Sequence, residues 1–199
     1  MRNDLKDIIA TQPTQHSLDW YRARLGRFTG SQVGRLMKSG RGKDDIFSKD
    51  ALSYINEIVA ERMLNPSVVM VDDLFDEYLM QATATSKAMA WGNDQEMNAR
   101  SMYASITKRK VTSCGAIQMY AYFADSPDGL CLDQDGAIEI KCPANKTHTE
   151  YLASVHDAES LKAIKPEYYW QCIAHMAASG AEWCDWMSYC PFNKKPLHI

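Results

Sequence analysis

The chain has 199 residues, of which 46% are hydrophobic and 24% charged, and its formal net charge is −3. This composition predicts one globular domain and argues against a protein that coats nucleic acid by bulk electrostatics. The sequence contains no apolar run of about 18 residues, no basic-then-apolar leader and no Cys-x-x-Cys pair. We therefore expect a soluble cytoplasmic protein with no membrane partner, and six reduced cysteines rather than zinc ligands or disulfides.

The amino-terminal region predicts short helices. Residues 1–16 predict a helix and a connector that breaks at Pro13. Ser17 is the expected N-cap of the next helix, and Gly26 is its expected end.

A basic block extends from Trp20 to Lys43, with seven Lys or Arg residues and no Asp or Glu. It could hold a phosphate backbone, and the alternative is the solvated face of a helix with a flexible loop. Within the block a helix is expected from Ser31 to about Lys38, and its first backbone N–H groups would attract an anion. The simpler interpretation is that Ser31 is only an N-cap residue.

An amphipathic helix is expected over residues 49–64, ended by Asn65-Pro66, and a loop with a short helix over residues 67–83. The expected apolar side of the first helix consists of Leu52, Ile55, Ile58, Val59 and Met63.

A long helix capped by Thr85 or Ser86 is expected to reach about Ser105. On this helix Glu96 lies among small or apolar neighbours, so it is either a third acid for a metal site or an exposed helix residue.

Apolar and polar residues alternate on both sides of Asp133-Gln134-Asp135-Gly136, which predicts a β-hairpin with a two-residue turn at Gln134-Asp135 or Asp135-Gly136. With either turn, the numbers of cross-strand partners sum to an odd number. Asp128 then faces the same side as Glu139 and Lys141, while Ile138 and Ile140 face the core.

Asp128, Glu139 and Lys141 therefore converge. Two carboxylates ~5–8 Å apart on neighbouring strands repel each other unless a cation lies between them, and oxygen ligands without His or Cys suit Mg²⁺ or Mn²⁺. The lysine would orient or deprotonate a water, or stabilise charge on phosphate. The alternative is a solvated face with a weak ion pair, which does not explain why Pro127 and Gly129 fix the backbone beside Asp128.

The remaining elements are strands over residues 110–119, 120–125 and 182–192, the start of another strand at Leu197, and helical segments from 145 to 164. Pro166 begins a further helix. Its polar row consists of Tyr168, Gln171 and His175, and its apolar face of Trp170, Ile173, Ala174 and Ala177. We expect His175 to be a satisfied, partly buried histidine rather than a ligand or base.

Asp128 with Glu139-Ile140-Lys141 resembles the PD-(D/E)xK nuclease signature, and longer motifs surround it. These are Trp20–Gly26, Thr29-Gly30-Ser31, Ala90-Trp91-Gly92 with Glu96, Ser126–Leu130, Glu139–Pro143, Tyr168 and Gln171. In this order they resemble lambda-type phage exonucleases, the YqaJ-like viral recombinases. The resemblance implies an α/β (α+β mixed) fold with a restriction-endonuclease-like core, a central mixed β-sheet flanked by helices, and a single PD-(D/E)xK nuclease domain over residues 1–199.

The resemblance also implies two Mg²⁺ ions, for which Mn²⁺ can substitute. Asp128 would touch both ions, Glu139 and the Ile140 main-chain carbonyl would hold one, and Glu96 would act through water. Lys141 would position the attacking water, and Gln171 would assist. The implied catalytic residues are thus Glu96, Asp128, Glu139, Lys141 and Gln171.

Contacts to DNA are implied in the same way. Arg24, Ser31 and Ser126 match a pocket for a terminal 5′-phosphate. Met89 matches an apolar wedge that splits the last base pairs, Arg41 matches an arginine that follows the duplex, and Tyr168 is assigned to DNA binding. One departure is Ile173, which replaces the second Gln of the family's Tyr-x-x-Gln-x-Gln motif.

The implied activity is a Mg-dependent, ATP-independent 5′-to-3′ exonuclease that degrades one strand of linear double-stranded DNA and leaves 3′ tails for recombination by strand annealing. Implied partners are duplex DNA ends, a single-strand annealing protein and further copies in a toroidal homotrimer, in a bacterial host that carries the phage or prophage. The alternatives are another PD-(D/E)xK nuclease, either an endonuclease or a Cas4-like enzyme, and an inactive DNA-end-binding scaffold. The scattered cysteines disfavour the iron–sulfur cluster of a Cas4-like enzyme.

Overall fold

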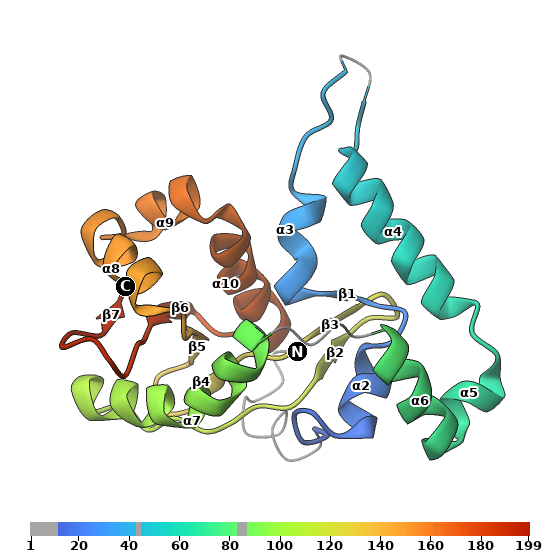
Figure 1. The fold of residues 1–199 in the computed structure, drawn as a ribbon, viewed down its shortest axis with the longest axis horizontal. Coiled ribbons are helices and arrows are strands. Elements are labelled where there is room, and N and C mark those ends of the chain that lie inside the picture. The colour runs from blue at the N-terminus through green and yellow to red at the C-terminus, as the bar shows by residue number, and fades with distance from the viewer. Residues whose placement is uncertain (1–11, 43–44, 83–86) are drawn as a thin grey trace.

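The structure, a computed structural model, describes residues 12–42, 45–82 and 87–199 (Figure 1). Its helices are α2 (Leu18–Arg24), the 3-10 turn η1 (Gly30–Gln32), α3 (Val33–Leu36), α4 (Lys49–Arg62), α5 (Pro66–Met70), α6 (Asp72–Ala82), α7 (Lys87–Thr107), α8 (Asn145–Ser154), α9 (Ala158–Ile164) and α10 (Pro166–Ser179). Its strands are β1 (Phe28–Thr29), β2 (Ile117–Met119), β3 (Phe123–Asp125), β4 (Gly129–Cys131), β5 (Gly136–Lys141), β6 (Trp183–Ser188) and β7 (Leu197–His198).

The strands form two mixed sheets. In the three-stranded sheet, with order β1-β3-β2, β1 runs parallel and β2 antiparallel to β3. In the four-stranded sheet, with order β4-β5-β6-β7, β5 and β6 are parallel and the outer pairs antiparallel. The expected mixed α/β class is therefore confirmed, with the strands divided between two sheets rather than placed in one.

Helices cover both faces of the four-stranded sheet (Figure 1). On one face, Tyr103 of α7 packs with Ile138, Ile140 and Met187. On the other face, Trp186 packs with side chains of α8, α9 and α10. Helix α10 also contacts β2, β3, η1 and α3, so its buried face lies where the two sheets meet.

The β4–β5 hairpin confirms the predicted parity and corrects the predicted turn. Gly129 pairs with Ile138 and Cys131 with Gly136, which leaves a four-residue loop over residues 132–135. Asp135 takes the positive φ of +49°. Gly136 belongs to the strand instead, because a Cβ there would lie 2.0 Å from the Trp183 indole. The glycine thus makes room for a side chain of β6 rather than forming the turn.

Several element boundaries differ from those expected. Of the strand expected over 110–119, only β2 forms, and Thr112 makes an isolated bridge to Leu130. The helix expected after Ser31 is reduced to η1 and the single turn α3. Residues 66–82 form two helices, because Asn65 caps α5 with Pro66 in its first turn and α6 follows directly.

Ser17 and Gly26 bound α2 as predicted: the Ser17 hydroxyl accepts from the Trp20 N–H at 3.2 Å, and Gly26 adopts φ +65°. The expected helix over residues 1–16 falls largely outside the described part, and residues 12–16 are not helical. The expected caps Thr85 and Ser86 also lie outside it.

In two helices the buried face only partly matches the one expected. In α4 the buried residues are Ala51, Tyr54 and Ile58, whereas Leu52, Val59 and Met63 are exposed. The reason is Tyr54, whose hydroxyl accepts from the Thr29 N–H at 2.8 Å and whose ring lies under Arg35.

In α10, His175 is satisfied as expected but fully rather than partly buried, and Gln171 is buried with it. Of the expected apolar face, Ala174 is buried and Ala177 is exposed. The polar row can be buried because His175 makes its hydrogen bonds inside the protein.

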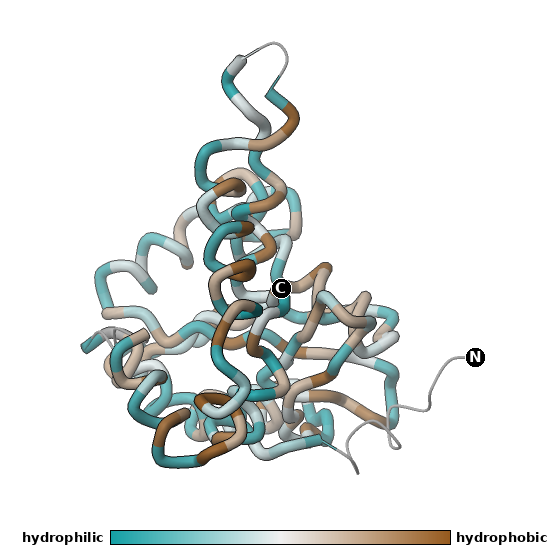
Figure 2. Tube along the Cα trace, turned by 90° about the vertical axis from the view of Figure 1, so that its right-hand side faces the viewer, coloured by the Kyte–Doolittle hydropathy of each residue, from teal (hydrophilic) through white to brown (hydrophobic). Residues whose placement is uncertain are grey.

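The described residues of the connection between α3 and α4, 37–42 and 45–48, project from the rest of the molecule in both views (Figure 1, Figure 2). They include exposed Arg41 together with exposed Ile46 and Phe47.

All six cysteines are free, as expected. Among the helices described, none is long and apolar enough to cross a membrane.

Candidate active site

Asp128 is anchored to the strand that faces it. It directly precedes β4, and its N–H donates to the Ile138 carbonyl at 3.1 Å. Its Oδ2 accepts from the Ile140 N–H at 2.6 Å, which fixes the carboxylate against β5. Burial and the nearby Glu139 charge raise the pKa of Asp128 well above its ordinary value, despite the opposing Lys141. Burial and the Glu139 charge therefore disfavour the ionised form of Asp128, and a further cation beside the two acids would favour it.

Glu139 lies in the middle of β5 and has no exposed surface. Its Oε2 is 2.6 Å from Nε2 of His175, and its Oε1 contacts the Lys141 ammonium. Burial by itself would raise the pKa of Glu139, but Lys141 and His175 outweigh it and hold the pKa below its ordinary value. Glu139 is thus held ionised at the centre of the molecule.

Lys141 lies two residues further along the same strand, on the same face. Its Nζ contacts Glu139 and lies 5.1 Å from the Tyr168 ring centroid. Burial alone would lower the pKa of Lys141, but the Glu139 and Asp128 charges raise it above its ordinary value. A lysine that stays protonated can orient a water or stabilise an anion, and this arrangement favours these roles over that of a base.

The acidic oxygens fit a hard divalent cation. Glu139 Oε1 is buried and accepts no hydrogen bond of good geometry, and Asp128 uses only Oδ2 in a hydrogen bond. Carbonyls alternate along a strand, so the Ile140 carbonyl points to the same side as that of Ile138, past the start of β4. In the described ranges no three His, Cys, Asp or Glu side chains are gathered closely enough to form a metal cage. Mg²⁺ ordinarily binds one or two carboxylates plus waters and substrate phosphates, so this donor set suits it.

Glu96 and Gln171 flank this centre. Glu96 forms an ion pair with Arg100 one turn along α7, and its charge contributes to the raised pKa of Asp128. Gln171 is buried on the same side of α10 as His175, and its amide bonds to no other described residue. Neither residue makes a hydrogen bond or ion pair with Asp128, Glu139 or Lys141.

Arg24 has the environment expected of an anion-binding residue. Its guanidinium lies 4.2 Å over the Trp20 ring, and no described carboxylate pairs with it. Burial removes part of the solvation of this charge and lowers the pKa of Arg24. An arriving phosphate would supply the missing partner.

Ser126 holds Trp20 beneath Arg24. Its Oγ accepts from Trp20 Nε1 at 3.0 Å and from Gln15 Nε2 at 3.1 Å, and donates to the Gly115 carbonyl at 3.0 Å. The hydroxyl is therefore fully used, and a direct contact with phosphate stays a prediction. Ser31 is exposed, with its Oγ 3.3 Å from Thr29 Oγ1.

Acids that lie outside the basic block neutralise much of its charge. Arg22 pairs with Asp19 and Asp72, and Arg35 and Lys38 pair with residues of α4. Within the described part of the block, Arg24, Arg27 and Arg41 have no carboxylate partner. The block is therefore not a continuous phosphate-binding surface, because only isolated cations remain available.

The three residues assigned to DNA binding lie apart. Tyr168 stacks on Trp186 beside Lys141, so it borders the acidic centre. Met89 is exposed in the first turn of α7, and Arg41 lies on the projecting connection. The structure brings only Tyr168 to the catalytic residues.

Two buried residues complete the centre and were not predicted to belong to it. His175 has no exposed surface, and its Nδ1 lies 2.5 Å from Oδ2 of Asp125 at the end of β3. Burial opposes charge on this ring, but the Asp125 and Glu139 carboxylates raise the pKa of His175 well above its ordinary value. The only signal in the sequence was the position of His175 four residues after Gln171 on one helical face.

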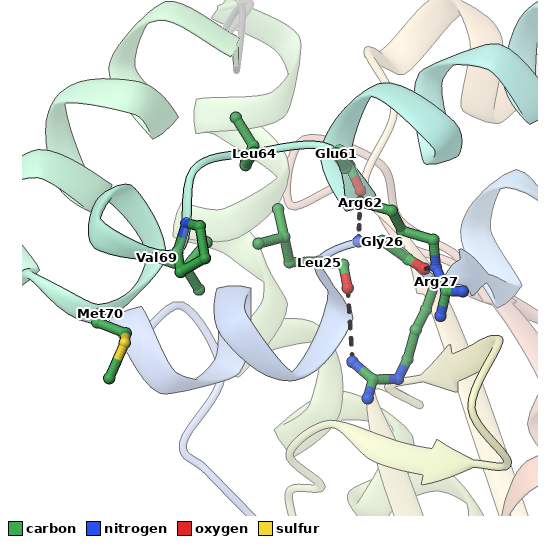
Figure 3. A pocket seen from close by; sticks show the side chains of 9 residues that line it. Leu25, Gly26, Arg27, Glu61, Arg62, Leu64, Val69 and Met70 are labelled. Carbon is green, nitrogen blue, oxygen red and sulfur yellow. Dashed lines mark hydrogen bonds between the residues drawn. The ribbon is translucent and has the colours of Figure 1, made fainter.

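A separate hollow of about 530 Å³ lies where α2 ends near α4 and α5 (Figure 3). Its polar groups are already engaged, since Gly26 N–H donates to Glu61 Oε2 at 2.7 Å and Arg62 Nε donates to the Gly26 carbonyl at 2.8 Å. None of the predicted site residues lines it.

Comparisons with known proteins identify the family and support the fold. The YqaJ-like viral recombinase domain matches residues 19–182. The chain is 30% identical to an alkaline exonuclease (LHK-Exo) from Laribacter hongkongensis, with a TM-score of 0.69 over 92% of this chain and 80% of that one. The structure of LHK-Exo in complex with dAMP gives a TM-score of 0.68 at 30% identity, over 92% of this chain and 82% of that one.

A phage related exonuclease from Haemophilus somnus 129PT shares the fold at 14% identity, with a TM-score of 0.61 over 82% of this chain and 68% of that one. No curated protein matches the sequence. The domain match covers most of the chain, and the enzyme that is 30% identical aligns over nearly all of it. The chain therefore belongs to the YqaJ-like viral recombinase domain family and is a nuclease.

Proposed function

We propose that this nuclease is a Mg²⁺-dependent, ATP-independent exonuclease that digests the 5′-ended strand of linear duplex DNA and leaves 3′ single-stranded tails. The observation that carries the proposal is that Asp128, directly before β4, lies beside Glu139 of the adjacent strand β5, with Lys141 touching Glu139. This arrangement combines oxygen ligands for a divalent ion with a fixed cation for the reacting phosphate.

The residues would divide the work of phosphodiester hydrolysis. Asp128, Glu139 and the Ile140 carbonyl would hold Mg²⁺, with Mn²⁺ as a substitute. Glu96 would act through water. Bound divalent ions supply Lewis acidity and lower the pKa of water, which is the chemistry that the side chains lack. Lys141 would orient the attacking water, and the Gln171 amide, which is free of other described partners, would assist in orienting the phosphate.

Recognition of the strand end would come from Arg24. Its guanidinium is half-buried, stacked on Trp20 and without a described carboxylate partner. Ser126 would keep Trp20 in place beneath it, and Ser31 would complete a pocket for a terminal 5′-phosphate. Met89 and Arg41 would contact the duplex further from the reacting bond.

The relative LHK-Exo has been solved with dAMP, a mononucleotide of the kind that stepwise digestion of DNA releases. The proposal further includes a toroidal homotrimer around DNA, cooperation with a single-strand annealing protein, and action in the cytoplasm of a bacterial host. These features are those of the family that the motifs resemble.

The test is digestion of linear duplexes that carry a label at either the 5′ or the 3′ end, with Mg²⁺ and without ATP. We expect early release of the 5′ label, retention of the 3′ label on the tail, and no cutting of a closed circular duplex. Asp128→Asn serves as the inactive control. Cutting of the circle would indicate an endonuclease, and DNA-end binding without any Mg²⁺-dependent release would indicate a scaffold.

A further inference from the structure

Three buried side chains form a continuous line through the interior. Asp125 ends β3, His175 lies in the middle of α10, and Glu139 lies in β5. The ring of His175 joins the two acids, with Nδ1 2.5 Å from Asp125 Oδ2 and Nε2 2.6 Å from Glu139 Oε2. The line therefore connects the two sheets through the helix that packs against both.

The ring position limits what Glu139 can do. Carboxylate oxygens accept hydrogen bonds, so each ring nitrogen of His175 faces an acceptor, and the ring cannot turn without breaking both contacts. Oε2 of Glu139 is occupied by His175, which leaves Oε1 as the oxygen that contacts Lys141. The carboxylate is thus available through one oxygen only.

The Gly30 backbone packs against Asp125 and limits its movement on that side. A Cβ built on Gly30 would lie 2.0 Å from Asp125 Oδ1 and 2.8 Å from its Cγ, so the carboxylate lies directly against the Gly30 backbone. Gly30 is the middle residue of the Thr29-Gly30-Ser31 motif. The segment beside the candidate phosphate pocket therefore holds the far end of the line in place.

We propose that His175 is a positioning residue that fixes Glu139 to offer a single oxygen, Oε1, to a divalent ion, with Asp125 fixing His175. The inference rests on the proposed function insofar as Glu139 is taken as a ligand of that ion. Groups that orient the ligands of a metal typically change metal affinity or activity ~10–100-fold when they are removed.

Direct Mn²⁺ binding without DNA, measured by calorimetry, tests this role. His175→Gln keeps a donor at the position of Nε2, and His175→Asn keeps one only near Nδ1. We expect His175→Asn to weaken Mn²⁺ binding ~10–100-fold and His175→Gln to stay within ~3-fold of the natural protein. The matched control is Ser179→Ala, which removes a buried hydroxyl bonded to the His175 carbonyl at 2.6 Å and should leave binding unchanged.

Glu139→Gln separates failure of this inference from failure of the metal site. If Glu139→Gln abolishes Mn²⁺ binding but a folded His175→Asn protein binds as tightly as the natural one, His175 does not position Glu139. If Glu139→Gln has no effect on Mn²⁺ binding, the metal site itself is wrong, and the inference fails with it.

A second measurement on the natural protein covers the case in which His175→Asn does not fold. In protein labelled with ¹⁵N-histidine, Mg²⁺ should shift the Nε2 resonance of His175 and leave that of His148 unmoved. His148 is equally buried but bonds to Ser188 and to the Lys195 carbonyl. An Nε2 resonance of His175 that does not move at saturating Mg²⁺ would overturn the inference.

Discussion

Replacing Gly30 with Ala should markedly lower the Tm of the protein. The new Cβ would lie 2.0 Å from Asp125 Oδ1, 2.8 Å from its Cγ and 3.3 Å from the Ala174 Cβ. The carboxylate would have to retreat by about 1 Å, which stretches its 2.5 Å contact with His175 to the limit of a hydrogen bond.

The loss in free energy of unfolding can be estimated from the steric clash and from the weakened contact between Asp125 and His175. Overpacking costs ~1–3 kcal/mol, and weakening a buried hydrogen bond between charged groups costs ~1.5–3 kcal/mol, so we expect a loss of about 3–5 kcal/mol. For a domain of this size, each kcal/mol lowers Tm by ~2–4 °C, so Tm should fall by about 6–20 °C. Differential scanning calorimetry without metal or DNA measures this directly.

Gly92 provides a control of opposite sign. It lies in α7, and no atom lies within 4 Å of the position that a Cβ would take there, so Gly92→Ala should stabilise the helix by ~0.5–1 kcal/mol. The decisive comparison is Gly30→Ala in an Asp125→Ala background, where the clash with the carboxylate is gone, only the 3.3 Å contact with Ala174 remains, and the loss of stability should fall to less than half. An equal loss in both backgrounds would refute the steric reasoning.

Three further predictions concern the site. Lys141→Ala should slow digestion by ~10³-fold in single-turnover assays, because the cation beside Glu139 is lost, whereas Lys162→Ala on α9 should keep the natural rate. Arg24→Gln should lower the preference for 5′-phosphorylated over 5′-hydroxyl ends by ~10-fold, and an unchanged ratio would remove Arg24 from the pocket. Asp128→Asn should raise the Tm of the metal-free protein at pH 8. Because the pKa of Asp128 is raised on folding, its protonated form adds stability at low pH that is lost as pH rises through the folded pKa. The difference in Tm should disappear near pH 4, and a Tm gain that persists there would contradict this account.

The hairpin could be predicted because residues close together in the sequence determine it. Alternation along β5 and the odd register sum were enough to place Asp128, Glu139 and Lys141 on one side, and the structure agrees. The predicted turn was wrong, because Gly136 is a strand residue that leaves room for the indole of Trp183, which lies 47 positions away in the sequence. Short-range turn preferences carry no information about such a neighbour.

The buried faces of α4 and α10 could not be predicted from hydrophobicity. Tyr54 is buried by a hydrogen bond to a strand residue, and His175 is buried by two acids from different sheets. Each of these partners is distant in sequence, so the sequence indicated a satisfied, partly buried His175 but not which acids it would meet. The same lack of long-range information made the basic block look more available to phosphate than it is, because the acids that neutralise Arg35 and Lys38 lie in α4.

The contact between Gly30 and Asp125 has a consequence for how this protein can vary among its relatives. An acid at position 125 tolerates no side chain at position 30 and needs a donor at position 175, so these three positions are constrained as a set. A relative with a neutral residue at 125 is free to carry a bulkier residue at 30 and a ring without a second donor at 175. Aligned sequences should therefore show the three positions changing together, while neighbouring surface positions such as Ala177 drift independently.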